Sequence, residues 1–433
     1  MKINQFRIIL CFLFICLFIL DMNAEISNSI KTDSIDMADS IDTTEDIRIN
    51  PEIEVDSFID DKKHPDYNFI NLTKNKIIFN NANWDEFYDK LSKSSSNTIS
   101  ILHIGDSHLQ ADIATGKTRI LLQEKYGNAG RGIIIPFKLA KTNEPFDYSI
   151  KCSGSYSYSS LMKRPWQTKL KLTGASISPS SEKFNLTIST NSKNTPIQEF
   201  KTLRIHVDGD LYIDDVKVNN KTLELDEDYF IEESQPDHTD IIFKNPHTSA
   251  QLSLSSSGRL TIFGVSLLTN TNGVIYNVIG NNGAAYDSYN RMGDMGQDCS
   301  IFNPDLIIIS LGTNEAFGSI SAENFYNSIA KFVDDMRNFN ENACILLTTP
   351  MECQKNGRIN SNIKRLRDVI IQYAATNNIA VYDFYEIAGG YGASQKWYSN
   401  KLMGGDKIHN TSKGYNLHGT LLYDALINPN KEY

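Results

Sequence analysis

Two polar blocks far apart in the chain contain the residue types of serine nucleophile chemistry. Ser107 follows the apolar run 99–104 and lies in the block Gly-Asp-Ser-His, and Asp406 and His409 lie three residues apart near the C-terminus. A serine becomes a nucleophile when an imidazole accepts its proton and a carboxylate holds that imidazole in one tautomer. The three residues therefore predict a catalytic triad, although Gly, Asp and Ser are also common in ordinary turns and helix caps.

Two further polar turns offer hydrogen-bond donors. The apolar run 274–279 leads to Gly-Asn-Asn-Gly, which ends at Gly283, and the apolar run 305–311 leads to Gly-Thr-Asn-Glu, which contains Asn314. Donors aimed at the oxygen of an acyl carbonyl stabilise the negative charge that develops there. We therefore expect an oxyanion hole formed by the N–H groups of Ser107 and Gly283 and the amide of Asn314.

These side chains require a sheet that brings several strand ends together. Buried strands are predicted at 99–104, 274–279, 305–311, 344–348 and 379–384, and amphipathic helices at 84–91, 110–125, 321–339, 363–375 and from 412 to about 427. This alternation predicts an α/β fold with a doubly wound, mainly parallel sheet. Such sheets bind ligands at the carboxyl ends of their strands, where Ser107 would lie.

The pattern changes between residues 138 and 268. Short alternating runs separated by Asn, Asp, Ser and Gly predict an inserted all-β sandwich. His206 alternates with apolar residues and is expected on the solvated face. The glycine-rich stretch 127–132 is interpreted as a flexible loop near the site. The aromatic side chains near the start of the insert could stack on sugar rings or pack at the domain junction; they are Tyr156, Tyr158 and Trp166.

The N-terminus has the composition of an export signal. Lys2 and Arg7 precede thirteen apolar residues, which is short for a transmembrane helix. Cleavage after Ala24 fits, but Met22 suits the upstream position badly, so an uncleaved membrane anchor stays open. We expect export to the periplasm or cell envelope. The chain thus divides into a signal or anchor at 1–24, an acidic tether at 25–66, the first part of the α/β core at 67–137, the β insert at 138–268 and the second part of the core at 269–433.

Charge and cysteine content restrict the partners. The segment 25–66 has thirteen acidic and four basic residues, so most of the net charge of −10 belongs to a predicted disordered tether. The remainder shows none of the clustered basic residues of a nucleic-acid surface. No metal or other cofactor is expected, because neither Cys-x-x-Cys spacing nor a histidine cluster occurs. The oligomeric state stays open, as do the three pairings of the four cysteines outside the signal: Cys152, Cys299, Cys344 and Cys353.

In their order along the chain, the four blocks resemble those of the SGNH/GDSL hydrolase superfamily. The serine, glycine, asparagine and histidine of that superfamily map onto Ser107, Gly283, Asn314 and His409, with Asp406 as the aspartate of a DxxH block. The first block reads GDSH where GDSL is the commonest form, and the third reads GTNE where GxND is frequent. Neither departure changes a catalytic position.

The long separation between Ser107 and Gly283 narrows the resemblance. A GDSH block, a Gly-Arg-Gly segment and an inserted β-sandwich are similar to the Gram-negative peptidoglycan O-acetylesterases, whose insert is similar to carbohydrate-binding modules. This resemblance implies a serine esterase that removes O-acetyl groups from a glycan, with O-acetylated peptidoglycan as the first candidate. The alternatives are another acetylated polysaccharide such as xylan, pectin or a sialoglycan, O-acetyl transfer by the same triad, and a non-catalytic glycan-binding surface protein.

Overall fold

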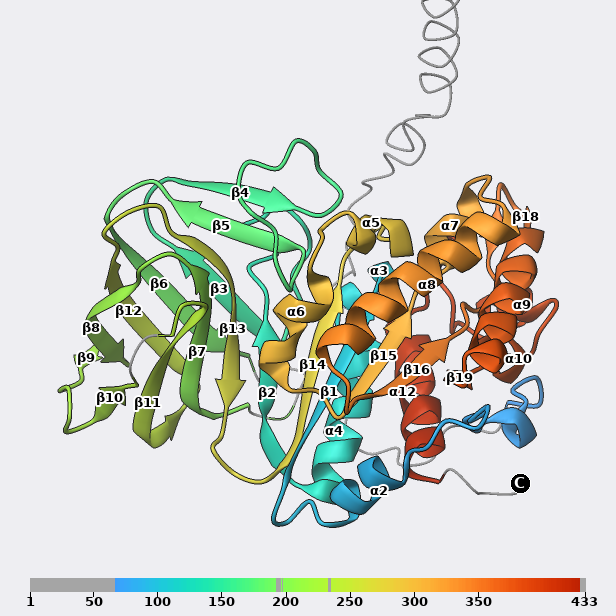
Figure 1. Ribbon diagram of the computed structural model, residues 1–433, viewed down its shortest axis with the longest axis horizontal. Helices are drawn as coiled ribbons and strands as arrows, with labels where there is room; N and C mark the ends of the chain where they lie inside the picture. The colour runs from blue at the N-terminus through green and yellow to red at the C-terminus, as the bar shows by residue number, and fades with distance from the viewer. Residues whose placement is uncertain (1–66, 192–195, 197, 233–234, 429–433) are drawn as a thin grey trace, which may run out of the picture. The chain divides into compact units, whose positions relative to one another are not determined.

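The strands that lead to the predicted site lie side by side in one sheet. The structure, a computed structural model, describes residues 67–191, 196, 198–232 and 235–428. Six parallel strands occur in the order β2-β14-β1-β15-β16-β19 (Figure 1). Their bounds are β1 Thr98–Gly105, β2 Asn128–Ile134, β14 Gly273–Gly280, β15 Leu306–Ser310, β16 Cys344–Thr348 and β19 Ala380–Tyr382.

The strands are apolar throughout because both faces of the sheet are covered. Alternate side chains of a strand point to opposite faces. In β1, Ile99 and Ile101 pack in one core cluster, and Leu102 and Ile104 pack in the other. The first cluster includes α2 (Asp85–Ser92), α10 (Phe384–Ile387), α11 (Ala393–Ser399) and α12 (Ser412–Ile427). The second includes the helices from α5 (Tyr286–Asn290) to α9 (Ser361–Thr376). The predicted doubly wound, mainly parallel sheet is confirmed.

The helices occur close to their predicted positions. One difference concerns the helix expected at 110–125, which is divided into α3 and α4 because Asp112 between them has a positive φ of 54°. The helices are α2 Asp85–Ser92, α3 Ser107–Gln110, α4 Ile113–Tyr126, α5 Tyr286–Asn290, α6 Met295–Cys299, α7 Thr313–Phe317, α8 Ala322–Phe339, α9 Ser361–Thr376, α10 Phe384–Ile387, α11 Ala393–Ser399 and α12 Ser412–Ile427, with 3-10 turns at Leu72–Lys74 and Ser300–Phe302.

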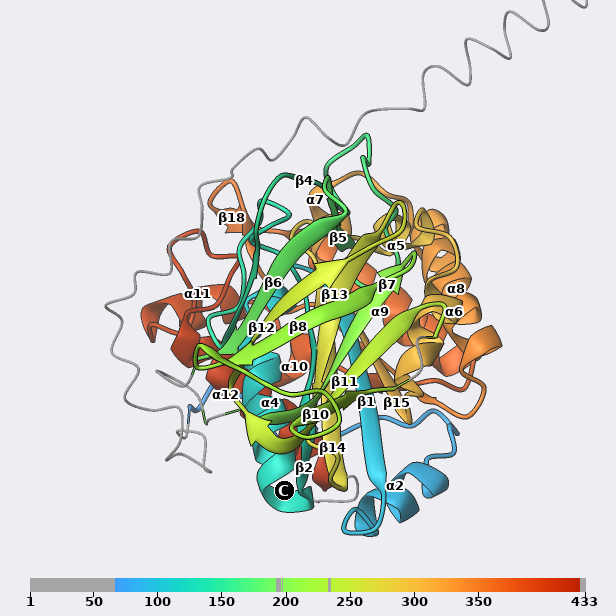
Figure 2. The same ribbon diagram turned by 90° about the vertical axis from the view of Figure 1, so that its left-hand side faces the viewer.

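The insert contains two antiparallel layers, and one of them continues the central sheet. β13 pairs with β2 of the parallel part on one side and with β7 on the other. This layer comprises β13 Thr261–Leu268, β7 Phe200–Asp208, β11 His238–His247, β10 Tyr229–Ile231, β5 Ala175–Pro179 and β4 Tyr156–Ser160. Figure 2 turns the insert toward the viewer.

The second layer is a separate sheet in the order β3-β6-β12-β8-β9. Its strands are β3 Tyr148–Cys152, β6 Lys183–Thr190, β12 Ser249–Ser255, β8 Tyr212–Val218 and β9 Lys221–Thr222, and a further small hairpin pairs β17 Gln354–Lys355 with β18 Arg358–Ile359. Leu186 and Leu252 of this layer share a core cluster with Leu203 and Val265 of the first. The insert is therefore joined to the rest of the molecule through hydrogen-bonded strands as well as through its two chain connections.

Two expectations for polar segments were wrong. His206 is buried rather than solvated, with Nε2 2.8 Å from Ser266 Oγ, because the ring of Phe302 packs against its imidazole with the ring centres 5.7 Å apart. The stretch 127–132 is not a flexible loop but contributes most of β2. A Cβ on Gly130 would lie 2.4 Å from the Leu267 carbonyl oxygen, so its lack of a side chain permits the close, bulged pairing of β2 with β13.

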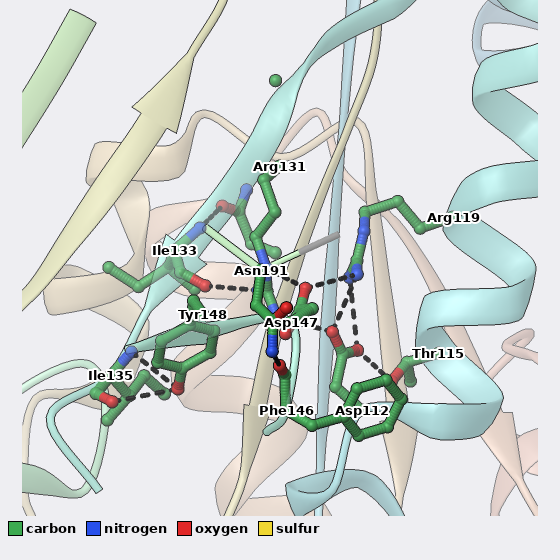
Figure 3. Close-up of polar contacts among 12 residues, drawn as sticks. Asp112, Thr115, Arg119, Arg131, Ile133, Ile135, Phe146, Asp147, Tyr148 and Asn191 are labelled. Atoms are coloured by element: carbon green, nitrogen blue, oxygen red, sulfur yellow. Dashed lines mark hydrogen bonds and ion pairs between the residues drawn. The ribbon is translucent and has the colours of Figure 1, made fainter. Parts of the chain in front are cut away.

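Arg131 of β2 belongs to a buried ion network (Figure 3). Its guanidinium contacts the carboxylate of Asp112 at 2.6 Å and that of Asp147 at 2.9 Å, and it lies 4.9 Å from the ring of Tyr148. Arg119 of α4 contacts the same two carboxylates. The network therefore fastens the beginning of α4, which directly follows the Ser107 helix, to β2 and to the first residues of the insert.

Other predictions have mixed outcomes. The signal and the tether at 1–66 lie outside the described residues. Within the described part of the chain, no helix is both long and apolar enough to cross a membrane.

All four cysteines after the signal have free thiols. Trp166 packs against the α/β core, whereas Tyr156 and Tyr158 pack against the core of the insert.

Candidate active site

The register of the sheet brings three of the polar turns together. Gly105, the last residue of β1, pairs with Gly280 of β14 and with Ser310 of β15. The next few residues of each strand contain Ser107, Gly283 and Asn314. Because the strands are parallel and end in the same row, all three turns emerge at the carboxyl edge of the sheet.

Ser107 begins the short helix α3. The carboxylate of Asp106 caps this helix by accepting the N–H of His108 at 2.9 Å. A Cβ on Gly105 would lie 2.5 Å from the Leu109 side chain and 2.7 Å from the Ser310 carbonyl oxygen. Glycine before the Asp-Ser pair therefore allows α3 to approach the sheet closely, which fixes where the serine hydroxyl points.

His409 lies within hydrogen-bond reach of Ser107. Its Nε2 is 2.9 Å from Ser107 Oγ, and its Nδ1 is 2.7 Å from Asp406 Oδ2. The other Asp406 oxygen accepts the N–H groups of Ile408 at 2.9 Å and of His409 at 3.0 Å. The loop precedes α12, which packs against α4; Thr118 Oγ1 donates to the Gly419 carbonyl at 3.0 Å across that contact. The contact between α4, which follows the Ser107 helix, and α12, which follows the His409 loop, thus fixes the two loops relative to each other.

The electrostatics favour one arrangement of protons. Burial acts to raise the pKa of Asp406, but the hydrogen bonds from the His409 ring and the two backbone N–H groups hold it below its ordinary value. An ionised Asp406 accepts the hydrogen of Nδ1, and the neutral imidazole then presents the lone pair of Nε2 to the serine hydroxyl. This is the tautomer that a general base toward Ser107 requires.

The expected oxyanion donors lie on the turns that follow β1, β14 and β15. Among the described residues, the backbone N–H groups of Ser107 and Gly283 have no hydrogen-bond acceptor. The side-chain amide of Asn314 donates to the Ala284 carbonyl at 2.9 Å and, at a longer 3.3 Å, to Asp106. Asn314 therefore lies between the Gly283 turn and the nucleophile block.

Three titratable residues beside the triad were not singled out from the sequence. Burial raises the pKa of Asp106 to about 6 and that of Glu315, in the Gly-Thr-Asn-Glu block, to about 7. Burial, with the neighbouring His409, lowers the pKa of His108 to about 3. The rings of His108 and His409 are 5.1 Å apart, and Tyr415 hydroxyl and His108 Nδ1 share a 3.1 Å hydrogen bond. The departure from GDSL to GDSH is the sequence signal that could have drawn attention to His108.

Gln110 and Met162 link the site to its surroundings. Gln110 Oε1 accepts the N–H of Asn282 at 2.6 Å, beside Gly283, while its Nε2 donates to the Asn143 carbonyl at 2.7 Å. Met162, from the insert, lies 3.7 Å from the position of a Cβ on Gly283. The insert therefore contacts the turn that supplies one of the expected oxyanion donors. Within the residues described, no group of three or more His, Cys, Asp or Glu side chains is arranged to hold a metal ion.

Comparison with known proteins agrees with this geometry. Residues 260–417 match the GDSL-like Lipase/Acylhydrolase family. The chain contains a GDSL-like acylhydrolase domain. This assigns it to the carboxylic ester hydrolases. The family match includes Gly283, Asn314, Asp406 and His409, whereas Ser107 precedes it and joins the domain through the pairing of β1 with β14 and β15.

Solved structures include one that shares the fold of this chain. A peptidoglycan O-acetylesterase superposes with a TM-score of 0.66 at 20% identity, over 81% of this chain and 98% of that one. A lipase/acylhydrolase from Enterococcus faecalis has a TM-score of 0.30 at 21% identity, over 37% and 80%, and the acetyl xylan esterase AlAXEase a TM-score of 0.30 at 20% identity, over 35% and 81%. No curated protein matches the chain in sequence.

Proposed function

We propose that the chain is a serine esterase that removes O-acetyl groups from a cell-envelope glycan, with O-acetylated peptidoglycan as the first candidate. The observation that carries the reaction is the continuous hydrogen-bonded line from Ser107 Oγ through His409 to Asp406 in an ester hydrolase. The choice of glycan is supported by the peptidoglycan O-acetylesterase that shares both the α/β part and the insert over 98% of its length.

The proposed reaction begins with the serine hydroxyl. His409 Nε2 takes the proton as Ser107 Oγ bonds to the acetyl carbonyl carbon, and the carbonyl oxygen becomes an oxyanion. The N–H groups of Ser107 and Gly283 and the amide of Asn314 stabilise that charge, the amide by exchanging its long contact with Asp106.

Collapse of the oxyanion breaks the ester bond. His409 returns its proton to the departing sugar oxygen, which leaves as the alcohol, and Ser107 remains acetylated. Water then attacks the acetyl carbonyl while His409 accepts one of its protons. The second collapse releases acetate and restores the Ser107 hydroxyl.

Acetate release tests the proposal. Purified protein is incubated with O-acetylated peptidoglycan and, separately, with acetylated xylan, beside the Ser107→Ala and His409→Ala variants. We expect release from peptidoglycan, lowered by about 10⁴-fold or more in both variants, as for other triads. Full activity of Ser107→Ala would overturn the assignment of the nucleophile, and release from xylan alone would replace the substrate. No release from either substrate would reject the esterase.

Asn314→Ala separates oxyanion stabilisation from binding. Loss of one such donor typically lowers kcat by about 10²–10³-fold. We expect this loss in kcat with KM little changed, because the donor acts on charge that is absent from the bound substrate.

Export is a further part of the proposal and rests on residues 1–24 alone. The acetylated envelope glycans lie outside the cytoplasm, so an enzyme acting on them requires a signal of this kind. Cell fractionation of the full-length protein is the test, and recovery only in the cytosol would exclude the envelope substrate.

A further inference from the structure

One segment of the insert is basic although the chain as a whole is acidic. Residues 138–171 contain seven lysines and arginines and two acidic residues. Some of these cations have acidic neighbours. Lys169 pairs with Asp208 at 2.6 Å. The charge of Lys138 acts to lower the pKa of Glu144, and that of Lys171 acts to lower the pKa of Asp298.

The four other cations of the segment, Lys151 among them, have no such neighbour among the described residues. Lys141, Lys163 and Arg164 are exposed, and no ion pair among the described residues includes them. Lys163 Nζ donates to the Lys141 carbonyl at 3.2 Å, so the two stretches that contain these cations lie together. The result is a group of unneutralised positive charges on one surface.

Two separate contacts place this surface beside the Gly283 turn. Met162, which directly precedes Lys163, lies next to Gly283 itself. On the other side, Asn143, two residues after Lys141, accepts hydrogen bonds from the side chains of Asn282 and Gln110. Both stretches therefore meet the turn that offers an expected oxyanion donor.

The stretch 161–166 is held in a defined shape. The N–H of Leu161 donates to the Gly174 carbonyl at 2.8 Å, and the N–H of Lys163 donates to the Ser160 carbonyl at 3.1 Å. Trp166 Nε1 donates to the Leu161 carbonyl at 3.3 Å, and the Arg164 guanidinium lies 5.0 Å from the Trp166 ring. The cations are thus presented by an ordered turn, which reduces the entropy cost of engaging a ligand.

We propose that Lys141, Lys163 and Arg164 form a subsite for a carboxylate group of the acetylated glycan, beside the acetyl-binding position at Ser107 and Gly283. Lysine and arginine bind carboxylates through charge-assisted hydrogen bonds. The inference rests on the proposed function and specifies its substrate class: a glycan that bears carboxyl groups on its sugars or attached peptides, rather than a neutral acetylated polysaccharide.

The test compares an anionic with a neutral substrate. The double variant Lys163→Gln/Arg164→Gln is assayed against a soluble O-acetylated disaccharide peptide from peptidoglycan and against 4-nitrophenyl acetate. Lys169→Gln is the matched control, because it removes a charge of the same segment that Asp208 already neutralises. We expect kcat/KM for the anionic substrate to fall about 10-fold in the double variant only, with the small ester unaffected.

Salt provides an independent readout. Raising NaCl from about 50 to about 300 mM should lower kcat/KM of the wild type for the anionic substrate several-fold and that of the double variant distinctly less, since only Lys141 of the three cations remains to be screened. Equal kcat/KM of wild type and double variant for the anionic substrate would overturn the subsite, and so would an equal loss on both substrates.

Binding distinguishes failure of the subsite from failure of the proposed function. Affinity of the same disaccharide peptide is measured by calorimetry with Ser107→Ala, alone and combined with the double variant. If the wild type releases no acetate, the proposed esterase is rejected. If the disaccharide peptide nevertheless binds more weakly to the double variant, the subsite is retained. If acetate is released but the affinity does not depend on these cations, the esterase is retained and the subsite is rejected.

Discussion

Asp106, the residue before the nucleophile, is fully buried and has its pKa raised to about 6. Between pH 4 and 6 the folded protein therefore holds a proton that the unfolded chain has lost, so this carboxyl lowers the free energy of unfolding as the pH rises through that range. Asp106→Asn cannot ionise. We expect the variant to gain stability relative to the wild type between pH 4 and pH 7, by up to about 3 kcal/mol.

Urea unfolding at pH 4, 5.5 and 7 measures this difference. Ser107→Ala serves as the control, because it leaves the carboxyl in place. A stability difference between Asp106→Asn and wild type that stays constant with pH would contradict the prediction.

His108 is close to the triad, yet it is not placed to move protons. Its pKa is lowered to about 3, so it is neutral near pH 7, and its Nδ1 is engaged with Tyr415. We expect His108→Leu, which creates the commoner GDSL block, to retain kcat/KM on 4-nitrophenyl acetate within about 10-fold, whereas loss of an acid–base group costs about 10²–10⁴-fold. A loss as large as that of His409→Ala would instead assign His108 a part in proton transfer.

The grouping of Ser107, Asp406 and His409 could be predicted because the chemistry of a triad restricts the residue types. The supporting residues could not, because their contacts are made by partners distant in sequence. Gln110 bonds to a residue 172 positions away, Asp106 to one 208 positions away and His108 to one 307 positions away. Strand pairing brings the first two partners to the site, and the packing of α12 on α4 brings Tyr415.

At the scale of elements, the ion network of Figure 3 joins α4, β2 and the segment before β3. Asp147 accepts contacts from both Arg119 and Arg131, and all three side chains are almost fully buried. Asp147→Asn would leave buried positive charge uncompensated. We expect it to lower the free energy of unfolding by about 3–5 kcal/mol in urea titration at pH 7.

An exposed ion pair is the matched control. Asp89 and Lys93 form an i,i+4 pair on the surface of α2, with side chains about 60% exposed. Asp89→Asn should cost less than about 0.5 kcal/mol. Similar effects of the two substitutions would show that the buried network contributes no more than a surface pair.

The elements were predictable where periodicity was strong. Continuous apolar runs identified β1, β14 and β15, and the apolar faces of α8 and α9 identified those helices. β2 was not recognised because Gly130 and Gly132 interrupt its pattern, and its pairing with β13 depends on a strand at the far end of the insert. A pattern within one segment does not contain that information.

For the molecule as a whole, the shared sheet predicts that the insert is required for folding. Deleting residues 138–268 would remove β13 from the edge of β2, Asp147 from the ion network and the Thr173 carbonyl that accepts a hydrogen bond from Asn281. We expect the deletion variant to be aggregated and inactive on both 4-nitrophenyl acetate and peptidoglycan. Soluble yield and small-ester turnover are the measurements.

The double variant Lys163→Gln/Arg164→Gln provides the comparison, since it should keep small-ester turnover. A soluble deletion variant with wild-type turnover on the small ester would show that the insert is an independent module whose loss affects only the polymer.

The order of strands also determines when the catalytic edge can form during synthesis. β1, which leads to Ser107, has β14 and β15 as its neighbours, and β2 has β13 and β14. All of these neighbours are translated after most or all of the insert. A ribosome therefore releases the nucleophile strand long before any partner exists for it, and such exposed strands are prone to aggregate. Assembly of the catalytic edge must be a late, long-range folding event, and the growing chain needs protection until β14 arrives.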